Sequence, residues 1–186
     1  MPVSDYLRNL RSKVGHDLVL IPSVMMIVRD DKGRILLIRN ADFNSWTPPG
    51  GSIEPDEPPE EAAIREMREE TGLLVEPVRI IGVYGGPEYR FVYPNGDIAS
   101  YVATVFECKV VSGEMAPDYE ESLDVRYFSE AELDSIHTLP ADRIVLRDAF
   151  NEVRSGDAST GTPNRDADSQ RLQSRAKKCE TPAGGE

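Results

Sequence analysis

Three glutamates near the middle of the chain have a spacing that could bind a metal ion. Glu66, Glu69 and Glu70 stand at positions i, i+3 and i+4, so on a helix their carboxylates share one face. Like charges at this spacing repel one another. A hard cation such as Mg²⁺ or Mn²⁺ prefers carboxylate oxygens and would remove that repulsion. The alternative is an ordinary solvated, acidic helix face.

The residues around these glutamates form a longer fixed pattern. Residues 51–73 read GSIEPDEPPEEAAIREMREETGL. This segment fits the Nudix box without a mismatch, and the matching positions are Gly51, Glu57, Arg65, Glu66, Met67, Glu69, Glu70, Gly72 and Leu73. So many fixed positions rarely coincide by chance, and the chain therefore resembles the Nudix hydrolases.

The resemblance implies an enzyme that hydrolyses phosphoric anhydride bonds. The activity it favours is Mg²⁺-dependent attack of water on phosphorus, with Mn²⁺ as a possible substitute. The expected substrate is a nucleoside diphosphate linked to another moiety, of the ADP-ribose or nucleotide-sugar type. Two alternatives stay open: a sanitising nucleoside triphosphate pyrophosphohydrolase, and a non-catalytic Nudix-fold sensor that binds a nucleotide. Sensors often lose box carboxylates, whereas this chain keeps them all.

The resemblance also assigns roles within the box. It implies that Glu66, Glu69 and Glu70 bind the metal together with the backbone carbonyl of Gly50, which precedes the first glycine of the box. The alternative for Gly50 is a plain tight turn.

Two further box residues are expected to support catalysis. The resemblance implies that Glu57 pairs with Arg65 and braces the loop against the helix. Arg65 also stands four residues from both Glu61 and Glu69, where it could hold a catalytic carboxylate in place.

The general base lies either in the box or in a later loop. Glu121 is the preferred candidate, since it stands six residues before Tyr127, the spacing at which several family members place such a glutamate ahead of an aromatic residue. Glu69 is the alternative base, and an inert, exposed loop glutamate is the alternative for Glu121.

Residues outside the box are expected to choose the substrate. Segment 84–90 offers glycines, two tyrosines and an arginine, and from it Tyr89 could stack on a base and Arg90 could bind a phosphate. The alternative for this segment is a plain glycine loop beside a strand. Trp46 is a further candidate for stacking, with simple packing as its alternative. Pro48 departs from the family pattern, which has an aliphatic residue there, so strand pairing before the box is expected to differ.

The elements that position these residues follow from local signals. Pro58 and Pro59 suit the first turn of a helix, and Gly72 suits its end. Runs 18–28 and 35–38 predict a hairpin around the turn at 30–33, and runs 89–93 and 98–111 predict another around Asn95-Gly96.

The C-terminal part adds further elements. A strand is expected at 124–128, a capping box of Ser129 and Glu132 after it, and a last helix near 141–153 that packs through Ile144, Val145 and Ala149, with Leu146 and Phe150 beside them. The fold class is therefore α/β, and the resemblance implies the Nudix α/β/α sandwich, with a mixed sheet between helices.

Three regions are expected along the chain. Residues 1–14 predict an amphipathic helix capped by Ser4, residues 15–153 the Nudix hydrolase domain, and residues 154–186, rich in small and polar residues, a disordered tail. The N-terminal helix is one place where a homodimer could form.

Charge and composition limit the partners. The net charge is −12, which disfavours a polynucleotide and favours a small, metal-chelated nucleotide. There is no apolar run long enough to span a membrane. Cys108 lies in an apolar strand pattern and Cys179 in the tail, so a disulfide framework is not indicated and a reducing cytoplasm is the expected location.

Overall fold

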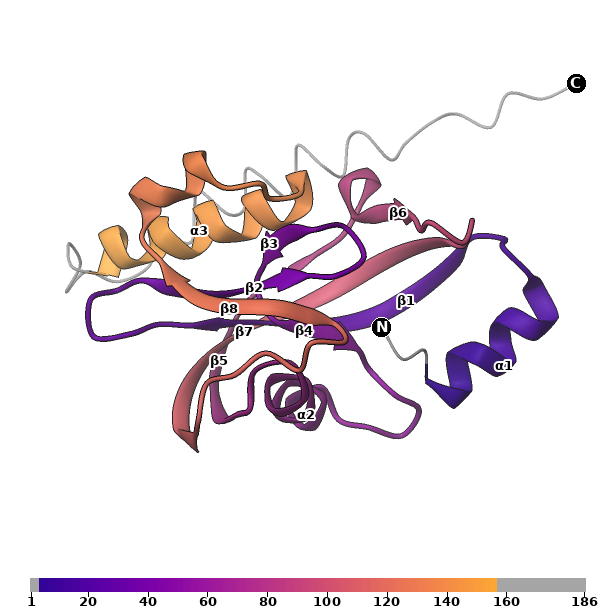
Figure 1. Ribbon diagram of the computed structural model, residues 1–186, viewed down its shortest axis with the longest axis horizontal. Helices are drawn as coiled ribbons and strands as arrows, with labels where there is room; N and C mark the ends of the chain where they lie inside the picture. Colours follow the sequence, from indigo (N-terminus) through magenta and orange to yellow (C-terminus); the bar gives the residue numbers. More distant parts are fainter. Residues whose placement is uncertain (1–3, 157–186) are drawn as a thin grey trace, which may run out of the picture. The chain divides into compact units, whose positions relative to one another are not determined.

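Two β-sheets and three α-helices make up the described part of the chain (Figure 1). The computed structural model describes residues 4–156, with side chains as far as Glu152. In chain order the elements are α1 (Asp5–Val14), β1 (Val19–Val28), β2 (Ile35–Asn40), β3 (Ser45–Thr47), β4 (Gly50–Ser52), α2 (Pro59–Thr71), β5 (Leu73–Tyr84), the 3₁₀ turn η1 (Pro87–Tyr89), β6 (Arg90–Val92), β7 (Ile98–Gly113), β8 (Ser122–Phe128), the 3₁₀ turn η2 (Glu130–Ser135) and α3 (Pro140–Gly156).

The strands divide between a mixed sheet and an antiparallel one. The larger sheet has the order β4-β1-β7-β5, and β6 also pairs with β7. Within it β1 and β7 run parallel, while the other pairs are antiparallel. The smaller sheet has the order β3-β2-β8 and is antiparallel. The predicted α/β class with a mixed sheet is confirmed, although the strands form two sheets and not one.

Helices α2 and α3 cover opposite faces of the strands (Figure 1). Successive side chains of a strand point to opposite faces. Met26 of β1 accordingly packs in a core with Met67 of α2, while its neighbour Ile27 packs in a second core with Val145 and Leu146 of α3. The α/β/α sandwich is thus built from strands that are apolar on both faces.

Helix α2 begins and ends where the sequence predicts. Pro58 is its N-cap and Pro59 its first residue, where the missing N–H of proline costs no hydrogen bond. Gly72 ends the helix with φ 72°, a left-handed conformation that glycine adopts without strain. The box glutamates therefore lie in the last two turns of a helix with well-defined ends.

The first predicted hairpin is wrong in its pairing. The turn is present, since the amide of Gly33 donates to the carbonyl of Asp30 at 2.9 Å. However, β1 pairs with β4 and β7, and β2 pairs with β3 and β8. Strands β1 and β2 therefore lie in different sheets, and an isolated bridge between Arg29 and Ile35 joins them next to the turn. Both strands are largely buried, and distant partners decide their pairing.

The second predicted hairpin is present. Strands β6 and β7 pair antiparallel, with Val92 opposite Ile98. The turn between them contains Asn95 and Gly96, and Gly96 has φ 90°, a value that favours glycine. The structure also contains the predicted capping box, in which Ser129 bonds Glu132.

The terminal helices differ from expectation in detail. Helix α3 runs to Gly156, and Ile144, predicted to pack, is 40% exposed because it lies beside the buried stripe of Val145, Leu146 and Ala149. The rest of the predicted disordered tail lies outside the described residues. Helix α1 has the predicted cap, in which the Ser4 Oγ accepts the amide of Leu7 at 3.1 Å. No helix among residues 4–156 is both long and apolar enough to cross a membrane.

Candidate functional site

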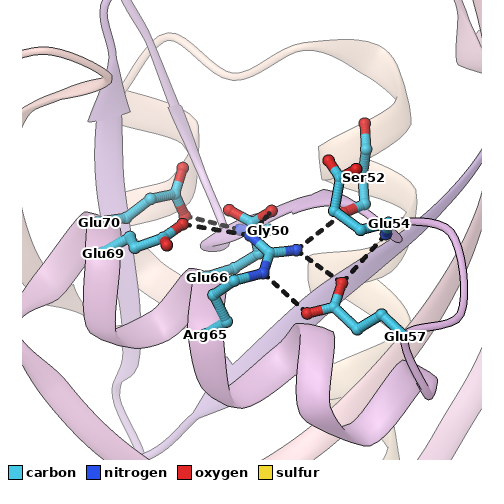
Figure 2. Close-up of polar contacts among 8 residues, drawn as sticks. All are labelled: Gly50, Ser52, Glu54, Glu57, Arg65, Glu66, Glu69 and Glu70. Carbon is cyan, nitrogen blue, oxygen red and sulfur yellow. Dashed lines mark hydrogen bonds and ion pairs between the residues drawn. The ribbon is translucent and has the colours of Figure 1, made fainter. Parts of the chain in front are cut away.

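Two of the three box glutamates are buried. Glu66 and Glu70 are 7% and 2% exposed, whereas the side chain of Glu69 is 59% exposed. The amide of Gly50 donates to the Oε2 of Glu70 at 2.8 Å (Figure 2). A side chain at position 51 would overlap the carboxylate of Glu66. Gly51 therefore lets the backbone of β4 lie directly against Glu66, and a side chain at position 50 would overlap the carbonyl of Val24 in β1.

Arg65 joins the helix to the loop that precedes it (Figure 2). Its Nε donates to the Oε1 of Glu57 at 2.8 Å, and its Nη2 donates to the carbonyl of Ser52 at 3.0 Å. Its Nη1 donates to Glu66 at 2.7 Å and to Glu69 at 3.1 Å. One guanidinium thus contacts both sides of the box, and it lowers the pKa of Glu57 by hydrogen bonding.

The loop that carries Glu121 is fastened to the end of α2. The Oγ of Ser122 donates to the carbonyl of Glu70 at 2.6 Å. Asp118 accepts the amides of Glu120, Glu121 and Ser122 at 2.8–3.0 Å. These bonds hold the loop although it contains Tyr119 at φ 65°, a conformation that costs a non-glycine residue on the order of 1 kcal/mol.

The carboxylates around this loop raise one another's pKa values. Burial raises the pKa of Glu66, and burial together with the charge of Glu66 raises that of Glu70 well above its usual range. Burial raises the pKa of Glu121 to about 7, with Glu66, Asp118 and Glu69 adding to the effect. The structure therefore gathers negative charge where water is largely excluded.

This donor set fits a hard divalent cation. Among the described residues, no three Asp, Glu, His or Cys side chains converge as a ready metal cluster. However, Glu66 and Glu70 are buried carboxylates that repel each other, and a cation bound to their oxygens would offset that repulsion. The absence of a side chain at Gly51 keeps the space beside Glu66 open.

A cavity opens next to these carboxylates, with walls from both sheets. Gly50, Gly51 and Glu70 line it on the box side. Part of its remaining wall is aromatic, formed by Phe43, Tyr89, Phe91, Tyr93 and Tyr101. An aromatic cavity beside a charged centre suits a ligand with a flat ring and a phosphate chain.

The residues predicted to bind substrate divide between this cavity and other places. Tyr89 lines the cavity, is 4% exposed and donates its hydroxyl to the carbonyl of Ala141 at 3.3 Å. Trp46 packs edge-on against Phe128, with ring centroids 4.6 Å apart, and Arg126 covers its ring. The side chain of Arg90 is exposed on β6. Neither Trp46 nor Arg90 is among the lining residues.

Pro48 lies where the chain passes between the sheets. Strand β3 ends at Thr47 in the smaller sheet, and β4 begins at Gly50 in the larger one. Pro48 and Pro49 form the link, and the carbonyl of Pro49 accepts the amide of Met26 at 2.9 Å. The departure from the family pattern therefore falls at a strand boundary.

Two lining residues were not predicted from the sequence. Ser45 and Asp142 are 0% and 5% exposed, and the Oγ of Ser45 and the Oδ2 of Asp142 have no hydrogen-bond partner among the described residues. A signal for Asp142 was available, since it stands three and four residues before Val145 and Leu146. An acidic residue on the apolar stripe of a helix is expected to be buried, which costs free energy unless the carboxylate has a partner.

Comparison with known proteins identifies the family of this chain. The sequence model of the NUDIX domain family matches residues 19–150. The chain is 39% identical to a MutT-like protein from Streptomyces ambofaciens over 108 residues, which are 58% of this chain and 62% of the relative. It is 38% identical to an RNA pyrophosphohydrolase from Acinetobacter baylyi over 81 residues, 41% of this chain and 49% of the relative.

Solved structures extend the agreement to the fold. The crystal structure of the MutT protein from Methanosarcina mazei Go1 superimposes with a TM-score of 0.58 at 28% identity, and covers 77% of this chain and 99% of that chain. The aligned parts of the two curated relatives are less than two thirds of their lengths.

Proposed function

This chain belongs to the NUDIX domain family, and from that membership and the site we propose that it hydrolyses the pyrophosphate bond of a nucleoside diphosphate linked to another moiety. ADP-ribose and nucleotide sugars are substrates of this type. The observation that carries the proposal is the placement of buried Glu66 and Glu70 against Gly50 and Gly51 at the wall of an aromatic cavity. A nucleotide whose base lies in the cavity would present its phosphates to the carboxylates.

The proposal includes a divalent metal, which Nudix hydrolases generally use. Glu66, Glu69, Glu70 and the carbonyl of Gly50 are the proposed ligands, and Mg²⁺ is the proposed ion, with Mn²⁺ as a substitute. When bound, the ion would neutralise phosphate charge and make water a better nucleophile. The buried carboxylates support this assignment, because their raised pKa values show how poorly they carry charge alone.

Arg65 acts in the proposal as a positioning residue. It holds Glu66 and Glu69 while Glu57 and the Ser52 carbonyl hold it in turn. These contacts fix the carboxylates without side-chain motion at the moment of reaction, which is how preorganised sites lower barriers.

Glu121 is the proposed general base. A base works best when its pKa lies near the working pH, and the pKa of Glu121 is raised to about 7. Its loop is bonded to the carbonyl of Glu70 through Ser122, which supports a position near the site. Glu69, which is exposed and bonded to Arg65, is the alternative base.

The setting of the reaction is also part of the proposal. We infer a small nucleotide substrate and a cytoplasmic location. The acidic composition supports the first, since a net charge of −12 repels long polyanions. The chain has two cysteines, one of them the buried thiol of Cys108, and this does not indicate a disulfide framework, which supports a reducing compartment.

The first test is a substrate panel with Mg²⁺. It contains ADP-ribose, nucleotide sugars, nucleoside triphosphates and 5′-triphosphorylated RNA, and product phosphates are measured with and without EDTA. We expect one nucleoside diphosphate derivative to be preferred, and EDTA to abolish its turnover. Preference for a triphosphate or for RNA would replace the proposed substrate class, and nucleotide binding with no turnover would favour a sensor.

Matched variants test the residue roles. Glu70→Gln should lower kcat by about a hundredfold or more, whereas Glu60→Gln, on the exposed first turn of the same helix, should not. Glu121→Gln should lower kcat by about a hundredfold, and Glu120→Gln, its exposed neighbour, should not. Equal activity of Glu121→Gln and the wild type would move the base to Glu69.

A further inference from the structure

The loop before β8 holds the backbone of Glu121 on both sides of that residue. The amide of Glu121 donates to the Oδ1 of Asp118 at 3.0 Å. The carbonyl of Glu121 accepts the amide of Ala41, which follows β2, at 2.9 Å. Because both backbone groups are bonded, the side chain of Glu121 leaves the loop in a fixed direction, and its freedom is limited to its own rotamers.

One carboxylate oxygen organises this loop. The Oδ1 of Asp118 also accepts the amides of Glu120 at 2.9 Å and Ser122 at 2.8 Å. Burial acts to raise the pKa of Asp118, but these amides outweigh it and the pKa lies below its usual range. Hydrogen bonds to an ionised acceptor are stronger than bonds between neutral groups. The loss of Asp118 would therefore release several amides of the loop at once.

Ser122 ties the same loop to α2. It is buried, and its hydroxyl donates to the carbonyl of Glu70 at 2.6 Å. The oxygen of that hydroxyl accepts the amide of Asp118 at 3.1 Å. A hydroxyl has one proton to donate, and the shorter contact assigns it to Glu70. The residue next to Glu121 is thus bonded directly to the backbone of a proposed metal ligand.

We propose that Asp118 and Ser122 are positioning residues, which together hold Glu121 in a fixed place relative to Glu70. The inference rests on the proposed function, in which Glu121 is the general base. Neither residue contacts the substrate in this account, and both act through Glu121.

A base on a loop needs such support. It must lie within about 2.6–3.2 Å of the group whose proton it takes, or reach that group through one water molecule. The box glutamates are held by a helix, whereas Glu121 is held by the bonds of Asp118 and Ser122. The left-handed conformation of Tyr119, at φ 65°, agrees with this account. Such strain persists only where the surrounding structure over-determines the backbone.

The test measures kcat of Asp118→Ala in two backgrounds, with the substrate that the panel identifies. One background is the wild type and the other is Glu121→Gln. If Asp118 acts through Glu121, its loss should lower kcat about tenfold in the wild type and less than about twofold in Glu121→Gln. KM should change little. An equal loss in both backgrounds would show a merely structural role and would overturn the inference.

Matched variants sharpen the test. Asp118→Asn keeps an oxygen that accepts amides and should recover most of the lost kcat. Ser122→Ala should lower kcat about fivefold with the same dependence on background, and it takes the place of Asp118→Ala if that variant fails to fold. Asp124→Ala removes a partly exposed aspartate paired with Arg126 in β8 and is the control, with unchanged kcat.

Hydrogen exchange gives a readout that needs no turnover. Segment 118–122 should exchange about tenfold faster in Asp118→Ala than in the wild type, while α2 keeps its protection. Unchanged exchange in this segment would overturn the inference, because the loop would then be held without Asp118.

The outcomes separate this inference from the proposed function. Turnover by the wild type that neither Asp118→Ala nor Ser122→Ala lowers would overturn the inference and leave the enzyme. Equal activity of Glu121→Gln and the wild type would overturn the inference and move the base to Glu69. The absence of turnover by the wild type on every substrate would contradict the proposed function, and the inference with it.

Discussion

At the scale of single residues, the site concentrates buried negative charge that the fold neutralises only in part. Arg65 neutralises part of the charge of Glu66 and Glu69. For Glu70 the amide of Gly50 acts against burial and the repulsion of the neighbouring carboxylates, which nevertheless raise its pKa. Folding therefore binds protons at Glu66, Glu70 and Glu121, whose pKa values all rise.

This arrangement predicts how metal-free stability depends on pH. The folded state holds these protons more tightly than the unfolded state, so the free energy of unfolding falls as pH rises. For Glu121 the fall lies between its ordinary pKa of 4.5 and its folded value of about 7. Urea unfolding in EDTA should give a lower free energy at pH 8 than at pH 5. Added Mg²⁺ should restore part of it at pH 8.

The same experiment has an internal control. Glu121→Gln carries no titrating group at position 121 and should reduce the slope between those pH values, while Glu66, Glu70 and Asp142, whose pKa values are also raised, supply the rest. The lowered pKa values of Glu57 and Asp118 act below their ordinary values of 4.5 and 3.8, outside this window. A metal-free protein that is more stable at pH 8 would contradict the electrostatic account of the site.

Single residues also show how far the sequence predicts the site. The contacts of Arg65 with the box glutamates could be predicted because these residues belong to one helix and the loop before it. Within such a segment, distance along the sequence determines which side chains meet. Ser45 and Asp142 come from β3 and α3, and only the tertiary fold brings them to one cavity. Trp46 was ambiguous, since an indole can either stack on a ligand or fill a core, and here it packs on Phe128.

At the scale of elements, local sequence signals predicted where helices and turns end better than they predicted which strands pair. Gly72 ends α2 and Gly96 forms the turn between β6 and β7, in both cases through a positive φ that glycine adopts readily. Both features were predicted correctly. The pairing of β1 with β7 joins residues about 80 positions apart, as in Val19 with Ala99. No local pattern distinguishes that partner from the adjacent β2, so the hairpin prediction failed there.

Helix α1 is the element with the weakest attachment among the described helices. It has no buried residue. Its main link to the sheet is Arg11, which donates to the carbonyls of Asp17 at 2.6 Å and Ile98 at 2.9 Å and lies 3.6 Å from Asp97. Since apolar burial supplies most helix stability, one side chain should control whether α1 stays folded.

We therefore expect Arg11→Ala to release α1 and leave the sheets intact. Hydrogen exchange followed by mass spectrometry should show faster exchange in residues 5–14, by about tenfold, with no change in β1 or β7. Arg8→Ala removes an exposed pair with Asp5 and should alter exchange much less. Faster exchange throughout the larger sheet would show that α1 supports the whole fold.

At the scale of the whole molecule, net charge would oppose the approach of the proposed nucleotide substrate. The chain carries −12, and a nucleotide with a pyrophosphate is also an anion. Salt screens such repulsion over a Debye length of about 10 Å at 0.1 M. At constant free Mg²⁺, kcat/KM should therefore rise about twofold when ionic strength increases from roughly 20 mM to 200 mM.

Stopped-flow or initial-rate measurements with the preferred substrate check this expectation. A small neutral solute added at matched viscosity controls for changes in diffusion. A steep fall of kcat/KM with salt would mean that positive groups near the site dominate the approach, in conflict with the acidic surface.

The link between β3 and β4 has a mechanical consequence. Walls of the cavity come from both sheets, and Pro48 and Pro49 connect those sheets directly. Proline fixes φ, so this connection has fewer free backbone dihedral angles than an ordinary loop. We expect the distance between the two walls to be set by the fold before a ligand binds. The thickness of a ring that fits between them would then be limited without any closing movement of the chain.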